Sequence, residues 1–163
     1  MRKRIISSDS RQSSNSRQTP LPNQDWLHLG DGVEIELTSE DALHPVEGAL
    51  LPGAESGWRA EKPGEQTIRF VFDQPQVLKR IWLHFEESEI KRTQEFVLRW
   101  SPDGGRSLQE IVRQQWNFSP PVTTEEIEDY CIELSGVTLL ELNIIPDKSG
   151  GEALASLRQL RLA

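Results

Sequence analysis

The pair of residues best suited to contact a ligand lies in a polar segment at residues 114–126. Trp116 presents a flat aromatic surface of the kind that stacks on a sugar ring, and Asn117 beside it has an amide that hydrogen-bonds to hydroxyl groups. In the alternative interpretation, Trp116 closes the end of a hydrophobic core with Phe118 next to it, which is the more common fate of a tryptophan. The sequence favours this second interpretation without excluding the first.

Two further polar residues and one histidine complete the set of candidate binding residues. Arg92 and Gln94 supply a fork of hydrogen-bond donors and an amide at the end of a charged segment, residues 86–94. Such a run of charges is more often a solvated loop than a binding site. His44 lies in the longest irregular segment, where it is able to contact a ligand or a metal, although an isolated loop histidine seldom does.

Patterns that carry catalysis or hold a metal are missing from the sequence. Cys131 has no histidine near it in sequence, so a thiol nucleophile is not expected. The chain has no Gly-x-Ser-x-Gly, no glycine-rich phosphate loop and no His-Glu-x-x-His motif. Because no His-x-x-x-His spacing occurs either, no zinc site is predicted. The sequence therefore favours a protein that is not an enzyme.

The elements that must position these residues are β-strands. Phe96, Leu98 and Trp100 alternate with Val97 and Arg99, which is the period of a half-buried strand, and the segment 102–105 then forms a turn. Similar alternation occurs at residues 33–37, 67–72, 77–85, 127–134, 138–145 and 157–162. About eight strands with frequent turns and no long helix predict an all-β, antiparallel sandwich or barrel.

The connections between these strands predict where a binding site lies. If every connection reverses the chain, the loops fall alternately at the two ends of the sandwich. One end receives the loops at residues 39–56, 86–94, 114–126 and 146–152, and the other receives those at 73–76, 101–107 and 135–137. The first group is the longer, and long loops at one end of a rigid sandwich are a common arrangement for a binding site.

Length and charge limit the remaining possibilities. The chain has 163 residues, which suits one domain, here residues 21–163. Residues 1–20 carry five basic residues and one acidic residue among many Ser, Asn and Gln, and are expected to be a disordered basic tail. The formal net charge is −8, so the body of the protein is strongly acidic and repels nucleic acid.

The sequence also predicts a location. The basic start is followed by only Ile5 and Ile6, which is too short for a signal peptide, and no run of apolar residues is long enough to cross a membrane. A single cysteine suits a reducing compartment. These observations predict a cytoplasmic protein without membrane insertion.

Several motifs resemble those of one superfamily. They are Gly57-Trp58-Arg59-Ala60, Leu78-Lys79-Arg80-Ile81-Trp82-Leu83, Phe96-Val97-Leu98-Arg99-Trp100-Ser101-Pro102-Asp103-Gly104 and Ala155-Ser156-Leu157-Arg158-Gln159-Leu160. In this order, over residues 57–163, they resemble the galactose-binding-like superfamily, which includes discoidin domains, the C-type domains of coagulation factors and many carbohydrate-binding modules. The resemblance implies an eight-stranded jelly-roll sandwich that binds a ligand with loops at one end and does not catalyse a reaction.

Two further expectations follow from the resemblance. No cofactor is expected, although a structural calcium is common in the superfamily, and Glu47, Glu55 or Asp147 are able to supply oxygen ligands. The superfamily's framing cysteine pair is absent, which fits an intracellular member. The leading hypothesis is a non-catalytic module that binds a carbohydrate-like ligand through Trp116, Asn117, Arg92, Gln94 and His44.

The alternative hypothesis is an intracellular protein–protein interaction module of the same fold. In this version Trp82 and His84, on the strand face opposite Ile81 and Leu83, bind a protein partner. A covering N-terminal segment around Trp26 is the simpler explanation of that face.

Overall fold

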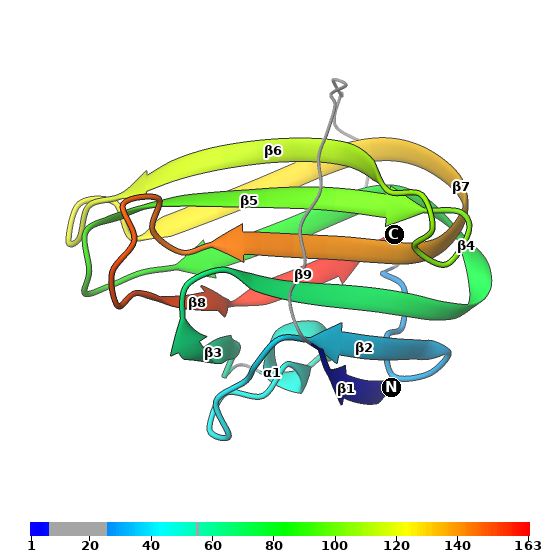
Figure 1. Cartoon of the computed structure of the whole chain (residues 1–163), viewed down its shortest axis with the longest axis horizontal. Helices are drawn as coiled ribbons and strands as arrows, with labels where there is room; N and C mark the ends of the chain where they lie inside the picture. The colour runs from blue at the N-terminus through cyan, green and yellow to red at the C-terminus, as the bar shows by residue number, and fades with distance from the viewer. Residues whose placement is uncertain (7–25, 55) are drawn as a thin grey trace.

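The computed structural model describes residues 1–6, 26–54 and 56–163. Its elements, in chain order, are β1 (Arg2–Ile5), β2 (Val33–Leu37), α1 (Glu47–Leu50), β3 (Trp58–Pro63), β4 (Gln66–Glu86), β5 (Arg92–Ser101), β6 (Gln109–Phe118), β7 (Glu125–Ile145), β8 (Leu154–Leu157) and β9 (Gln159–Leu162). Figure 1 shows that the strands form two layers, one in front of the other in this view, with α1 near β2 at the lower edge. The prediction of an all-β sandwich is confirmed.

Two long strands, β4 and β7, take part in both layers. Each has 21 residues, and their pairing shifts register between Val71 and Arg80, where both ribbons turn over at one end of the molecule (Figure 1). One layer has the strand order β1-β2-β4-β7-β5-β6. In the other layer the second half of β4 pairs with the first half of β7 and with β9, and β3 pairs with β8. Bulges of this kind allow one strand to pass from sheet to sheet.

The hydrophobic core lies between the layers and follows the predicted alternation. Phe96 and Leu98 of β5 are fully buried, and the Phe96 ring stacks on Phe85 of β4 with 5.2 Å between ring centroids. Trp58 is also buried, and its Nε1 donates to the backbone oxygen of Ser39 at 3.2 Å. The tryptophan of the Gly57-Trp58-Arg59-Ala60 motif is therefore part of the core.

The beginning of the chain departs from the expected tail. Residues 2–5 form strand β1, which pairs in parallel with β2, whereas residues 7–25 lie outside the described part of the structure. The charges explain the strand, because the Arg2 side chain pairs with Asp73 and Arg4 pairs with Glu36 of β2. Composition alone predicted a basic tail and missed these acidic partners.

Two segments that the sequence suggested were loops belong to strands. Residues 92–94 begin β5 and residues 114–118 end β6, and the two strands pair so that Gln94 lies opposite Trp116. From Arg113 to Phe118 of β6, exposed residues alternate with partly or fully buried ones, because one face of this strand is exposed. The loop at 39–56 contains the one-turn helix α1, whose Ala49 and Leu50 are buried.

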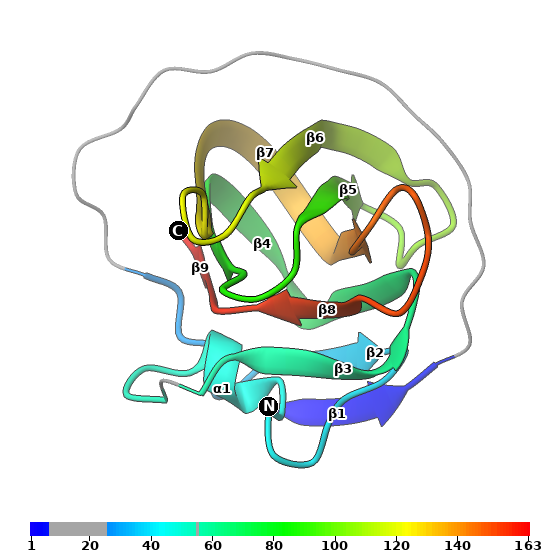
Figure 2. The same cartoon turned by 90° about the vertical axis from the view of Figure 1, so that its left-hand side faces the viewer.

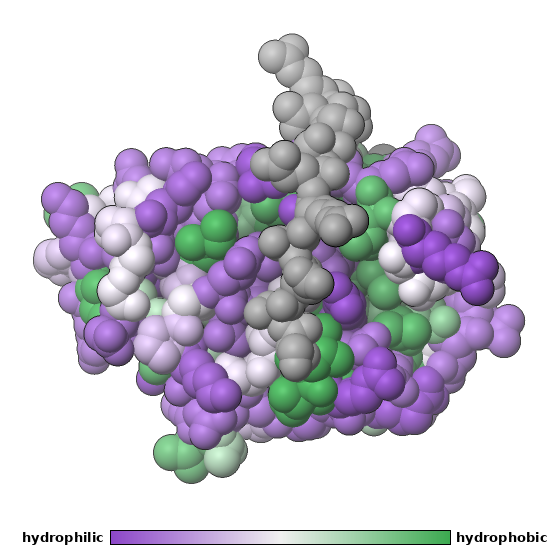
Figure 3. All heavy atoms as spheres, viewed as in Figure 1, coloured by the Kyte–Doolittle hydropathy of each residue, from purple (hydrophilic) through white to green (hydrophobic). Residues whose placement is uncertain are grey.

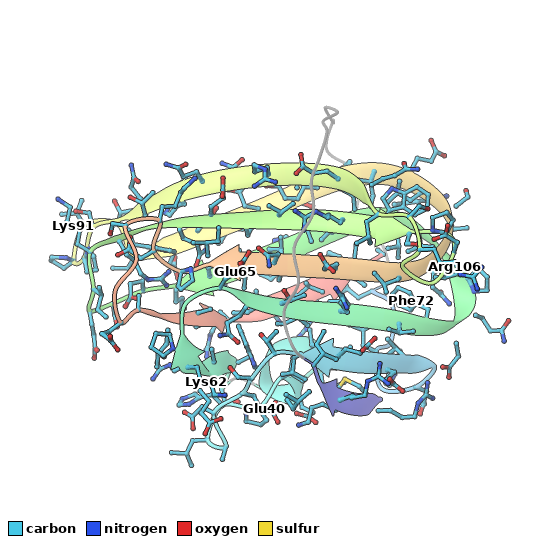
Figure 4. All side chains as sticks on the ribbon, viewed as in Figure 1. Glu40, Lys62, Glu65, Phe72, Lys91 and Arg106 are labelled. Carbon is cyan, nitrogen blue, oxygen red and sulfur yellow. The ribbon has the colours of Figure 1, made fainter. Side chains whose placement is uncertain are left out.

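The long loops gather at one end of the sandwich, as predicted. The β4–β5, β6–β7 and β7–β8 connections meet at the left of Figure 1 and face the viewer in Figure 2. Lys91 marks this end in Figure 4, and Arg106, in the β5–β6 connection, marks the opposite end. On the face seen in Figure 3, hydrophobic residues form separate areas within a mainly hydrophilic surface. None of the described helices is long and apolar enough to cross a membrane.

Candidate functional site

A hollow of about 560 Å³ opens among the loops at the end marked by Lys91. Four stretches far apart in the sequence line it. They are His44 with residues 56–59, the β4–β5 connection at 86–90, residues 124–125, and residues of the 152–158 stretch around β8. The sandwich therefore brings parts of all four predicted loops, or the strands next to them, around one space.

Backbone and side-chain hydrogen bonds tie these loops to one another. The backbone nitrogen of Glu87 donates to the Thr124 oxygen at 2.7 Å, which joins the β4–β5 and β6–β7 connections. The backbone nitrogen of Lys148 donates to the Thr93 oxygen at 2.8 Å, which joins the β7–β8 connection to β5. Connections fixed in this way keep the hollow open in one shape.

Arg92 joins the β4–β5 connection to the β7–β8 connection from inside the protein. Its guanidinium group is fully buried, and Nε donates to Glu87 Oε1 at 2.7 Å. Nη1 donates to Gln94 Oε1 at 3.0 Å and to the backbone oxygen of Pro146 at 2.7 Å, and the group lies 4.7 Å from the centre of the Phe118 ring. Arg92 thus supports the hollow without lining it.

The same contact sets the charge state of Glu87. Burial raises the pKa of the Glu87 carboxyl, but hydrogen bonds from Arg92 and from the backbone nitrogens of Glu89 and Ile90 outweigh burial and lower it. The carboxylate therefore stays ionised and organises the β4–β5 connection around itself.

Gln94 belongs to a buried polar cluster between the layers. It is fully buried, and its Nε2 donates to Glu126 Oε1 at 3.1 Å. Burial, reinforced by the neighbouring Glu128, raises the pKa of Glu126 to about 8, so this carboxyl is mostly protonated at neutral pH. Gln94 is engaged inside the protein and does not line the hollow.

Trp116 and Asn117 lie on opposite faces of β6. Trp116 packs against the core and is partly buried, whereas Asn117 is exposed and its Oδ1 accepts a hydrogen bond from Thr93 Oγ1 at 2.8 Å. Neighbouring residues of a strand point in opposite directions, so these two do not form a single surface for one sugar ring. The binding role of each one separately stays a prediction.

His44 is the predicted residue that does line the hollow. Its Nδ1 lies 2.8 Å from Asp41 Oδ2, and its backbone oxygen accepts from the backbone nitrogen of Arg59 at 3.1 Å. The hydrogen bond with His44 lowers the pKa of Asp41, as does the hydrogen bond from the backbone nitrogen of Leu43. His44 is therefore held at the edge of the hollow beside the start of β3.

The side chains that dominate the hollow were not predicted as binding residues. Its lining includes two arginines, Arg59 and Arg158, and five glutamates, which are Glu86, Glu87, Glu89, Glu125 and Glu152. The run of charges in residues 86–94 favours a solvated loop, with Arg92 and Gln94 as the candidate binding residues in it. The high density of charged residues in this segment was the available sign of a binding site. It indicates one only once the fold places the segment opposite residues 124–125 and 152–158.

The residues suggested for a structural calcium have different surroundings. Glu47 accepts hydrogen bonds from Lys3 Nζ at 3.0 and 3.1 Å, and Asp147 Oδ1 accepts from Ser149 Oγ at 2.8 Å. Glu55 lies outside the described residues. A calcium ion at any of them stays a prediction.

The two layers, the shared long strands and the loops around one end hollow define a galactose-binding-like β-sandwich. No protein-family model and no curated protein sequence matches the chain. Solved structures do match, and several are family 32 carbohydrate-binding modules, which have the galactose-binding-like fold.

Three solved structures illustrate the similarity. The module of C. perfringens NanJ in complex with galactose has a TM-score of 0.60 and 11% identity, over 80% of this chain and 93% of that chain. The module of AlyQ in complex with 4,5-unsaturated mannuronic acid has a TM-score of 0.61 and 15% identity, over 86% and 98%. A Clostridium perfringens module in complex with GalNAc-β-1,3-galactose has a TM-score of 0.58 and 18% identity, over 85% and 99%. At these identities the similarity shows the fold.

Proposed function

We propose that this protein is a non-catalytic module that binds a carbohydrate in the hollow at the end of the sandwich. The observation that carries the proposal is the convergence of loops from four parts of the chain on one space of about 560 Å³. That volume suits a small ligand, since such sites commonly have volumes of roughly 300–1,000 Å³. Structures of the same fold bind galactose and GalNAc-β-1,3-galactose, which supports a carbohydrate as the ligand.

The charge of the hollow favours a neutral sugar or an amino sugar. Sugar hydroxyl groups donate hydrogen bonds to carboxylates such as Glu125 and Glu152, and they accept hydrogen bonds from arginines such as Arg59. The five glutamates outnumber the two arginines and repel the carboxylate of a uronic acid, so uronic acids are expected to bind poorly. This expectation separates the protein from the similar module that binds an unsaturated mannuronic acid.

Polar contacts carry more of the proposed recognition than aromatic stacking does. Trp58 is the aromatic residue among those that line the hollow in the described part of the chain, and only 1% of it is exposed. Ile90, which is 46% exposed, supplies apolar surface for the carbon atoms of a sugar ring. Selectivity is then expected to follow the positions of the ligand's hydroxyl groups.

Titration calorimetry with galactose, N-acetylgalactosamine, glucosamine and galacturonic acid tests the proposal. The Arg59→Ala variant removes an exposed donor from the hollow, and Arg106→Ala removes an exposed arginine from the opposite end as a matched control. We expect at least one of the three sugars without a carboxylate to bind the wild-type protein and the control. Arg59→Ala is expected to weaken that binding by about 10-fold or more, because a hydrogen bond to a charged group contributes roughly 1.5–3 kcal/mol. Binding of galacturonic acid alone, or equal affinity in both variants, contradicts the proposal.

The Trp116→Ala variant shows where the ligand lies. Trp116 is on β6 and does not line the hollow, so this variant is expected to keep the sugar affinity of the wild-type protein. Loss of sugar binding in Trp116→Ala together with normal binding in Arg59→Ala would place the sugar site at β6, where the sequence predicts Trp116 and Asn117 as binding residues.

Protein binding is the second candidate function, and the outer face of β4 and β7 favours it. Trp82 lies half-buried there, beside His84, with 5.9 Å between the ring centroids. Ile127, opposite His84 in the register, is 55% exposed. In this version a cytoplasmic partner covers an apolar area around Trp82. Affinity capture with wild-type protein and with Trp82→Ser tests it, and an identical set of captured proteins counts against this face.

A further inference from the structure

Three metal-ligating side chains meet beside the hollow, on the outer face of β4 and β7. His84 and Glu86 are two residues apart on β4, so their side chains share a face, and Glu125 of β7 is the register partner of Glu86. His84 Nε2 lies 3.3 Å from Glu125 Oε1 and 3.7 Å from Glu86 Oε1. One ligand atom from each of the three residues lies within 4.8 Å of the other two.

The two carboxylates repel each other in this arrangement. Residues directly opposite on antiparallel strands have close side chains, and like charges at such positions are destabilising. Arg158 Nε lies 3.7 Å from Glu86 Oε2 and offsets part of this repulsion. Among the described residues, His84 is the ion-pairing neighbour of Glu125. A cation between the two glutamates removes the repulsion directly.

The histidine presents a nitrogen that lacks a hydrogen bond. His84 Nε2 has almost no exposed surface and no hydrogen-bond partner among the described residues, although carboxylate oxygens lie on two sides of it. The strand around it is fixed, because the backbone oxygen of His84 accepts from the backbone nitrogen of Arg158 at 2.9 Å. Buried polar atoms normally have a partner, so this nitrogen is available to bind a ligand.

We propose that His84, Glu86 and Glu125 bind a divalent transition-metal ion of the zinc type. One imidazole and two carboxylates suit zinc better than calcium, which prefers six to eight oxygen ligands. Bonds of roughly 2.0–2.2 Å in a tetrahedral site place ligand atoms about 3.4 Å apart, close to the 3.3 and 3.7 Å between Nε2 and the carboxylate oxygens. Small rotations of the exposed glutamate side chains complete the site.

The site has a position left for another ligand. Three protein ligands leave one tetrahedral position open, as in zinc sites that bind water or a substrate. Glu86 and Glu125 both line the hollow, so a metal ion bound by them would lie next to the space where a ligand enters. The sequence predicts no zinc site because it has no His-x-x-x-His spacing, whereas this cluster depends on strand period and on the register of β4 with β7.

Calorimetric titration of the full chain with zinc chloride, in the absence of any sugar, tests the proposal. We expect one site in the wild-type protein and weakening by at least about 100-fold in Glu125→Gln and His84→Gln. Losing an outer-shell partner already costs roughly 10–100-fold in metal affinity, and these variants lose a direct ligand. Glu133→Gln, an exposed glutamate on the same strand, and His28→Gln, a histidine that does not line the hollow, are the controls and should bind zinc normally.

The outcomes separate this proposal from the one on carbohydrates, since zinc is the only ligand added. Because His84 is partly buried, circular dichroism of each variant establishes that it is folded; the exposed Glu125 gives a second variant that leaves the core intact. Absence of a zinc site in the wild-type protein overturns the proposal. So does undiminished zinc binding in Glu125→Gln, and so does loss of zinc binding in His28→Gln alone.

Discussion

Replacing Arg92 by methionine is the sharpest test of how the hollow is held together. The side chain is fully buried, and its guanidinium group joins the β4–β5 connection through Glu87 to the β7–β8 connection through the Pro146 oxygen. Methionine has a similar length but no hydrogen-bond donors. The substitution therefore leaves the Glu87 carboxylate, which is only 15% exposed, without its cation.

The expected cost is that of breaking a buried ion pair. Removing one partner of such a pair typically destabilises a protein by roughly 3–5 kcal/mol, because the other charge stays buried and uncompensated. In a chain of this length, about 1 kcal/mol corresponds to a shift of roughly 2–4 °C in Tm, so Arg92→Met should lower Tm by roughly 6–20 °C. The exposed pair of Arg2 with Asp73 is the comparison, and Arg2→Met should lower Tm much less than Arg92→Met does.

A double-mutant cycle measured by urea unfolding isolates the pair. Glu87→Gln removes the charge that Arg92→Met leaves behind, so the double variant should be more stable than the two single effects predict, by about 1.5 kcal/mol or more. Additive effects within about 0.5 kcal/mol would refute the idea that Arg92 acts through Glu87. A loss of stability in Arg92→Met no larger than in Arg2→Met would refute the importance of its burial.

Two further substitutions test the turn after β5 and the edge of the hollow. Asp103 accepts hydrogen bonds from Ser101 and Ser107, which lower its pKa to about 2. The ionised carboxylate therefore stabilises the fold above its unfolded pKa of 3.8, and this effect is lost as the pH falls toward 2. Thermal melts should show that Asp103→Asn is less stable than wild type at pH 7 and equal to it near pH 2. Gly57 has φ +68°, and a Cβ there would lie 3.0 Å from the Leu157 oxygen. In urea unfolding, Gly57→Ala should therefore lose more stability than the roughly 1–2 kcal/mol that left-handed backbone strain alone costs. Gly53→Ala is the control, because Gly53 also has positive φ but open space around it, and it should show only that strain.

The fold was predictable because its strands repeat one simple pattern. Phe96 and Leu98 alternate with their neighbours, and both are buried in β5. The turn expected at 102–105 is present, with positive φ at Gly104 and Gly105. The jelly-roll class follows from many such strands joined by short reversals, and the galactose-binding-like fold is confirmed by the solved structures that it matches.

The predicted binding residues show where pattern reading is less informative. Arg92 and Gln94 are polar, and polarity suggested exposure, but each satisfies the other inside the protein together with Glu87 and Glu126. Whether a polar side chain is buried depends on its partners from distant segments. Trp116 and Asn117 looked like a pair because they are adjacent, and the strand that contains them separates their faces.

The hollow and the histidine–glutamate cluster depend on register, which a single sequence does not specify. Glu86 and Glu125 are 39 positions apart and become direct neighbours because the second half of β4 pairs with the first half of β7. A shift of that pairing by one residue would move Glu125 to the inner face and bring Glu126 outward. The buried Glu126, with its contact to Gln94, fixes the pairing that is observed. The buried cluster behind the hollow therefore determines which carboxylates the hollow presents, and a substitution within that cluster is expected to alter ligand binding as well as stability.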